Sequence, residues 1–145
     1  MSRCESEVRS GDRRRAIEIC RVSFERTRDE HDLAWAAQAY MYLDQLDEAE
    51  NLVRRLLTGP LFGDGHRILS YVMFRRGLGT AAWMHANLAL AAHTFARDES
   101  GMASDELLLS RAAWKVGAFT AVDQLLDVPG IGEAKLEALR DLVTV

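Results

Sequence analysis

The stretch DLAWAAQAYMYLDQLDEAENLVRRLLTGP, Asp32 to Pro60, decides the fold class of this chain. Its apolar residues recur at three- and four-residue intervals on both sides of Asp44, which is the spacing of two amphipathic helices joined by a tight turn. A single pair of this kind cannot bury its apolar faces, so it needs neighbours of the same kind. The stretch therefore predicts one helix-turn-helix unit within a stack.

The same pattern occurs four times along the chain. A turn-forming residue is followed five positions later by a small or medium apolar residue inside a new helix. The four segments are SGDRRRAIEIC (Ser10–Cys20), LDQLDEAENLV (Leu43–Val53), RGLGTAAWMHA (Arg76–Ala86) and VGAFTAVDQLL (Val116–Leu126). The first three are 33 residues apart and the fourth follows after 40. A repeat of this length is typical of a helical solenoid.

The repeat resembles the tetratricopeptide repeat family, whose period is about 34 residues. The second unit carries the best match, through Ala37, Tyr40, Leu46, Ala49 and Pro60. The resemblance covers residues 1–127 and implies an all-α, right-handed superhelix of about four antiparallel helix pairs, closed by a C-terminal capping helix. An irregular helical bundle with accidental spacing is the alternative.

The resemblance also implies a ligand site. In that family the first helix of each pair lines a concave face, and the matching positions here, with one more residue a turn earlier, are Gln38, Met41, Tyr42, Arg67, Tyr71, Phe74, Arg75, Arg111, Trp114 and Lys115. Residues 71, 74 and 75 share one helix face, so two rings and a guanidinium would stand together, as in partner-binding surfaces. Packing of the rings in the core, with the basic groups extending to solvent, is the alternative.

From these positions we expect a non-enzymatic adaptor or chaperone. Its groove would bind a protein or peptide segment that carries apolar and acidic residues. Because the groove residues are partly apolar, pairing of two copies into a homo-oligomer is also open. No nucleotide-binding loop or metal-ligand spacing is found, and His31, His66, His85 and His93 form no cluster in the sequence, so we expect no catalytic residue, metal or cofactor.

A second motif lies near the C-terminus, in LLDVPGIGEAKLEAL, Leu125 to Leu139. Over residues 121–142 it resembles the helix-hairpin-helix of DNA-processing proteins, in which backbone amides contact a phosphate. The matching positions are Gly130, Ile131, Gly132 and Lys135. This motif supports the alternative function, contact with DNA or RNA through the hairpin Pro129–Gly132. Five acidic residues surround it, which favours a terminal segment packed on the solenoid as a cap, and a protein-docking role is also open.

Composition sets further limits. The chain has 145 residues, a length typical of a single domain over 1–145, and its net charge of -4 has the wrong sign for a protein that wraps nucleic acid. Cys4 and Cys20 are too few for a disulfide framework, so we expect reduced thiols and a cytoplasmic protein. No apolar run is long enough to cross a membrane, and the charged start does not resemble a signal peptide.

Two segments carry local expectations. The stretch Thr80 to Ala96 is apolar nearly all round, which predicts a helix buried on two sides at the centre of the domain. The stretch Arg97 to Glu106 is the most polar in the chain. We expect a loop there, with Ser104 and Asp105 as N-cap candidates for the next helix.

Overall fold

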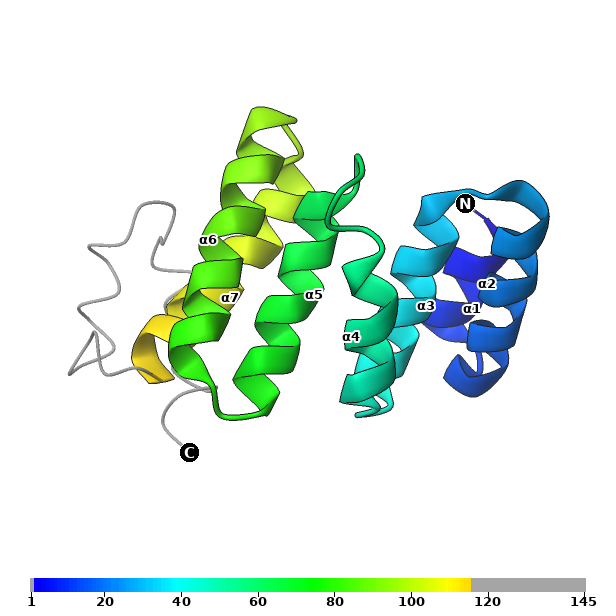
Figure 1. Ribbon diagram of the computed structural model, residues 1–145, viewed down its shortest axis with the longest axis horizontal. Helices are drawn as coiled ribbons and strands as arrows, with labels where there is room; N and C mark the ends of the chain where they lie inside the picture. Colours follow the sequence, from blue (N-terminus) through cyan, green and yellow to red (C-terminus); the bar gives the residue numbers. More distant parts are fainter. Residues whose placement is uncertain (1, 116–145) are drawn as a thin grey trace.

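The structure, a computed structural model, describes residues 2–115 and contains seven α-helices and no strand in that part (Figure 1). The all-α class predicted from the sequence is confirmed for these residues. The helices are α1 (Arg3–Ser10), α2 (Arg13–Thr27), α3 (Glu30–Tyr42), α4 (Leu46–Arg54), α5 (Phe62–Arg75), α6 (Gly79–Phe95) and α7 (Glu99–Lys115). None of them is long and apolar enough to cross a membrane.

The helix ends form where short polar side chains and turn residues predict them. The carboxylate of Asp12 accepts a hydrogen bond from the Arg14 amide at 2.9 Å and so caps α2. The predicted turn residues Asp44 and Gly77 have positive φ angles of 60° and 78°, the left-handed conformation that ends a helix. Gly11, the turn residue of the first repeat, is instead extended, with a φ of -101°.

The helices follow one another along the long axis of the molecule, with α1 and α2 toward one end and α6 and α7 toward the other (Figure 1). Each helix packs against the next, and α1, α3, α5 and α7 also pack against one another in a row. Within the described part, α2, α4 and α6 form no comparable row. The repeat alanines Ala16, Ala49 and Ala82 are fully buried, as predicted, because a methyl side chain lets neighbouring helices approach closely.

The expectation of a loop over Arg97 to Glu106 is wrong, because α7 already begins at Glu99. Asp98 caps the helix by accepting a hydrogen bond from the Gly101 amide at 2.9 Å. Asp105 is not an N-cap but a fully buried residue inside α7. The polar sequence suggested a loop, but Asp105 is buried because its partner, His93, lies on a different helix, α6.

The helix predicted over Thr80 to Ala96 is confirmed as α6, which packs against both α5 and α7. It is not enclosed, however. Met84, Leu88 and Phe95 expose 52%, 45% and 93% of their surfaces on the side that faces neither neighbour. Some of the apolar residues of α6 are therefore not buried in the core of the described residues.

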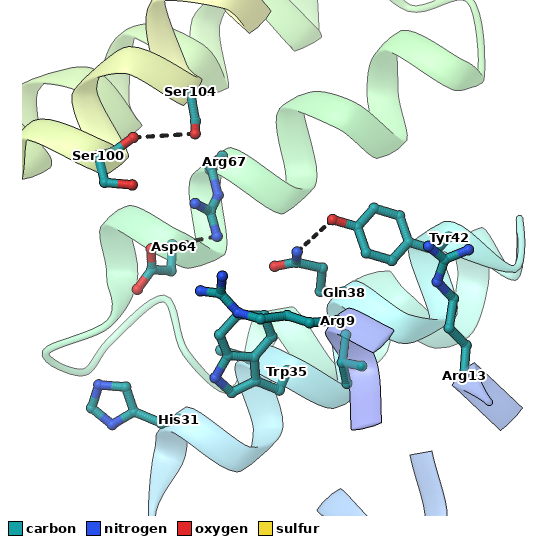
Figure 2. Close-up of a pocket in the computed structure, with 12 residues that line it drawn as sticks. Arg9, Arg13, His31, Trp35, Gln38, Tyr42, Asp64, Arg67, Ser100 and Ser104 are labelled. Carbon is teal, nitrogen blue, oxygen red and sulfur yellow. Dashed lines mark hydrogen bonds and ion pairs between the residues drawn. The ribbon is translucent and has the colours of Figure 1, made fainter. Parts of the chain in front are cut away.

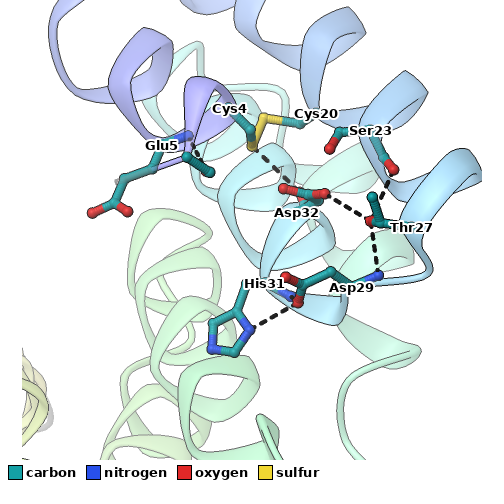
Figure 3. The surroundings of a disulfide bond; sticks show 9 residues. Cys4, Glu5, Cys20, Ser23, Thr27, Asp29, His31 and Asp32 are labelled. Atoms are coloured by element: carbon teal, nitrogen blue, oxygen red, sulfur yellow. Dashed lines mark hydrogen bonds and ion pairs between the residues drawn. A yellow bond between two sulfur atoms is a disulfide. The ribbon is translucent and has the colours of Figure 1, made fainter.

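The expectation of reduced thiols is also wrong. Cys4 on α1 and Cys20 on α2 form a disulfide, and both residues are buried (Figure 3). Cys4 Sγ lies 3.9 Å from the carbonyl oxygen of Asp32, so the bond sits where α1, α2 and α3 meet. Disulfides persist mainly in oxidising compartments, so the bond removes the argument on which a cytoplasmic location rested.

Candidate functional site

The row of odd-numbered helices forms a groove made of two adjoining hollows, which share Gln38, Tyr42, Arg67 and Ser104. The larger hollow has a volume of about 550 Å³ and lies toward α1 and α3 (Figure 2). The smaller, of about 270 Å³, lies toward α5 and α7. Together they are lined by Val8, Arg9, Arg13, His31, Ala34, Trp35, Gln38, Met41, Tyr42, Asp64, Arg67, Ile68, Tyr71, Ser100, Ser104, Leu107, Leu108 and Arg111.

The larger hollow is polar and cationic. The Arg9 guanidinium lies 5.1 Å from the ring centre of Trp35, and that of Arg13 lies 4.5 Å from the ring centre of Tyr42. Gln38 Nε2 donates a hydrogen bond of 2.6 Å to the Tyr42 hydroxyl, which fixes this ring (Figure 2). Aromatic faces thus hold two cations at the groove wall. Arg9 also pairs with Glu5 at 2.9 Å, which occupies part of its guanidinium.

The smaller hollow is mostly apolar. Its walls are formed by the side chains of Met41, Ile68, Tyr71, Leu107 and Leu108. Arg111 stands at its edge, and its guanidinium lies 5.4 Å from the ring centre of a neighbouring phenylalanine on α5. The hollow is therefore shaped to receive an apolar side chain next to a cation.

A chain of charged contacts connects the groove with the interior of the molecule. Arg67 points into the larger hollow and lies 3.7 Å from Asp64 (Figure 2). Asp64 Oδ1 lies 3.1 Å from Nε2 of His93, and Nδ1 of His93 contacts the carboxylate of Asp105. His93 and Asp105 are buried, with 5% and 0% of their surfaces exposed. These contacts join α5, α6 and α7, and Asp64 holds the guanidinium of Arg67 at one end of them.

Burial and charge shift the pKa values of this chain in a consistent way. Burial raises the pKa of Asp105 to about 6, although the hydrogen bond and charge of His93 oppose the rise. Burial alone would lower the pKa of His93, but the hydrogen bonds and charges of Asp105 and Asp64 outweigh it and raise the pKa. Both shifts mean that the folded protein holds protons here more tightly than the unfolded chain.

Two glycines make room for His93. A Cβ atom at Gly63 would lie 2.9 Å from Cβ of Ala92 and 3.1 Å from Nε2 of His93, and one at Gly101 would lie 2.7 Å from Cγ of His93. Non-bonded carbon and nitrogen atoms do not approach this closely, so a larger residue at either position would displace the imidazole of His93. Both positions therefore favour glycine. The histidine is therefore built into the contact of α5, α6 and α7.

A separate pair of histidines lies between α5 and α6. The rings of His66 and His85 are stacked with centres 5.2 Å apart, and their Nδ1 atoms are 3.0 Å apart. Burial lowers the pKa of both residues, and the charge of His85 lowers that of His66 further. In the part of the chain that the structure describes, no three His, Cys, Asp or Glu residues are placed to share a metal ion.

The structure brings six of the ten residues predicted for the groove together at its walls: Gln38, Met41, Tyr42, Arg67, Tyr71 and Arg111. Phe74 is half-buried beneath Arg111, and Trp114 is half-buried without lining either hollow. Arg75 pairs instead with Asp44 at 3.1 Å. The side chain of Lys115 lies outside what the structure describes.

Sequence reasoning missed three residues at the N-terminal end of the groove, namely Arg9 on α1, Arg13 on α2 and Trp35 on α3. Trp35 precedes Gln38 by three residues and Tyr42 by seven, so helical spacing alone could have placed it on the same face. Arg9 carries no such signal, because α1 has only eight residues and the repeat pattern does not extend over it.

Comparison with known proteins does not assign the chain to a family. No family model, curated protein or solved structure matches it. The predicted hairpin residues Gly130, Ile131, Gly132 and Lys135 lie outside the described residues, so contact with nucleic acid through them stays a prediction.

Proposed function

We propose that this protein is a non-enzymatic adaptor or chaperone that holds a segment of another protein in the groove between α1, α3, α5 and α7. We also propose that its helix pairs form a superhelix of the tetratricopeptide kind, for which the repeat spacing and the row of odd helices are the support. The main support for this function is that a cationic hollow adjoins an apolar one.

The walls define the chemistry of the segment. The described lining of the groove includes four arginines, Arg9, Arg13, Arg67 and Arg111, and one carboxylate, Asp64. Glu5, which does not line either hollow, pairs with Arg9 at 2.9 Å, so the arginines still outnumber the nearby carboxylates. The groove is thus locally cationic on a chain whose net charge is -4. Carboxylates would be attracted to it, because arginine donates paired hydrogen bonds to them. We expect acidic residues toward α1 and α3 and an aliphatic or aromatic anchor toward α5 and α7.

Helix geometry sets the length of the segment. Packed helices lie about 9 Å apart, so a groove that crosses four of them spans about 27 Å. An extended chain covers this distance in about eight residues. A segment of that length reaches both hollows at once, whereas a single amino acid or a small metabolite reaches only one of them.

A displayed library of random peptides of about 12 residues tests this proposal with the full chain. We expect enriched sequences to combine Asp or Glu with Leu, Ile or Phe. The variant Arg9→Glu with Arg13→Glu should lose the acidic preference, and Tyr71→Ala should lose the apolar one. Arg14→Glu with Arg21→Glu makes the same change of charge on α2, outside the residues that line the groove, and is the matched control.

The fold of each variant is checked by circular dichroism before selection. Enrichment of sequences without acidic residues would contradict the proposal. So would equal loss of binding in the groove variant and in the α2 control, because it would show a general effect of charge. A library in which nothing is enriched by the folded wild-type chain would also overturn it.

A further inference from the structure

The outer face of α6 differs from the corresponding faces of α2 and α4. Each of these even-numbered helices packs on the odd-numbered row. The exposed positions of α2 and α4 are largely charged, for example Glu18 and Arg21 on α2 and Asp47 and Arg54 on α4. The 17 residues of α6 include no Asp, Glu, Lys or Arg at all. Three helices in similar places thus expose two kinds of surface.

Four exposed apolar residues of α6, together with the half-buried Ala81, form a narrow stripe. Ala81, Met84, Leu88, Ala91 and Phe95 follow one another at intervals of three, four, three and four, which places them along one side of the helix. Met84, Leu88 and Phe95 expose 52%, 45% and 93% of their surfaces. Exposure of this extent on one stripe marks a contact surface rather than scattered surface apolar residues.

The stripe contains a projection and a hollow at equal distances from its centre. Phe95 stands seven residues after Leu88 and is almost fully exposed. Ala81 stands seven residues before Leu88, in an open hollow of about 570 Å³ that is also lined by Leu78 and Met84. Seven residues correspond to about 10 Å along a helix. A two-fold axis at Leu88 would place each phenylalanine over the hollow of another copy.

We propose that α6 is a dimerisation face, on which a second copy of this chain packs its own α6 in the antiparallel direction. Phe95 of each copy enters the hollow around Ala81 of the other, and Met84 faces Ala91, so large side chains meet small ones on both sides of the central pair of Leu88 residues. The absence of charge from α6 favours a second copy as the occupant, because an identical face then brings no like charges together.

The area suits a dimer of modest stability. Leu78, Met84, Leu88 and Phe95 each expose between 45% and 93% of their surface. At about 200 Å² for a large side chain, the pair of faces buries roughly 1,000 Å², the lower end for a specific interface. We therefore expect a dissociation constant of about 1–100 μM for this dimer. The groove lies on the odd-numbered helices and would remain open in this dimer.

Sedimentation velocity of the full chain, over about 1 to 500 μM, tests the proposal. We expect the wild-type chain to shift from monomer to dimer with concentration. Leu88→Asp should weaken the dimer by about 100-fold or more, because it places two buried carboxylates at the two-fold axis. Val22→Asp, at a residue that is 54% exposed on α2, is the matched control and should leave the dimer unchanged.

A second measurement reports the arrangement directly. In the double variant Ala81→Cys with Phe95→Cys, oxidation should link two chains covalently. Val22→Cys should give no such link under the same conditions. A wild-type chain that stays monomeric throughout would overturn the proposal, whether another part of the chain or a different protein covers α6. A dimer that survives Leu88→Asp and shows no 81–95 link would overturn it as well.

Discussion

The buried contact of His93 with Asp105 predicts an unusual dependence of stability on pH. The pKa of Asp105 rises from 3.8 to about 6 on folding, so its contribution is present below pH 3.8 and is lost as pH rises through 6. The pKa of His93 is also raised, so its contribution is complete below 6.5 and is lost at higher pH. Both residues therefore make the folded protein less stable as pH rises.

The size of the effect follows from the shift of Asp105. A change from 3.8 to about 6 corresponds to at most about 3 kcal/mol, of which about 2 kcal/mol is lost between about pH 4.5 and 8. Loss of the His93 proton adds to this above pH 6.5. Asp29 and Glu50, whose pKa values are lowered, act in the opposite direction, but only below their ordinary values of 3.8 and 4.5. The lowered pKa values of His66 and His85 also oppose the fall in stability, and they do so within this range, below 6.5.

Urea unfolding followed by circular dichroism, at several pH values between about 4.5 and 8, measures this slope. Across this range we expect the free energy of unfolding of the wild-type chain to fall by about 2 kcal/mol relative to that of Asp105→Asn, which keeps the shape of the side chain but removes the titrating group. Glu48→Gln, at an exposed position of α4, should keep the wild-type slope. Equal slopes in the wild-type chain and in Asp105→Asn would refute the reasoning.

Three further changes test the packing. Gly101→Ala should lower the free energy of unfolding by about 1–3 kcal/mol, because the new Cβ would lie 2.7 Å from Cγ of His93. Alanine normally stabilises a helix relative to glycine, so a variant that is more stable in urea unfolding would contradict this prediction. Replacing Cys4 and Cys20 by serine should lower the free energy of unfolding by about 3 kcal/mol, as expected for a disulfide that closes a loop of about 16 residues. In reductant, the wild-type chain should unfold at the same temperature as this variant. Val53→Ala, at a fully buried site, should cost about 2 kcal/mol in the same assay, and a loss below about 0.5 kcal/mol would show that the core can close around the gap.

The helical units could be predicted because their signals are local. Helix periodicity and turn residues act within a few positions, so the sequence alone identified two turns at Asp44 and Gly77 and two buried contacts at Ala49 and Ala82. The same locality explains why six of the predicted groove residues line the two hollows, since the odd-numbered helices repeat one register along the chain.

Apart from Trp35, the features that were missed depend on partners on other helices. Asp105 is buried because His93, 12 residues earlier on another helix, stands opposite it. The bond of Cys4 to Cys20 depends on how α1 lies against α2, which the spacing of 16 residues does not specify. The position of Arg9 at the groove depends on the same docking of α1. Local patterns assign elements, whereas these contacts arise from how the elements pack.

The apolar face of α6 shows how the two kinds of information combine. Sequence alone identified a helix without charges and led to a prediction that it is enclosed, because apolar helices usually are. Structure shows that α5 and α7 cover two sides of it and leave a third exposed. Neither observation points to a partner by itself. Taken together, they leave an apolar stripe that the described core does not use, in a position where α2 and α4 carry charge. This difference between α6 and the outer faces of α2 and α4 is the observation on which the proposal of a dimer rests.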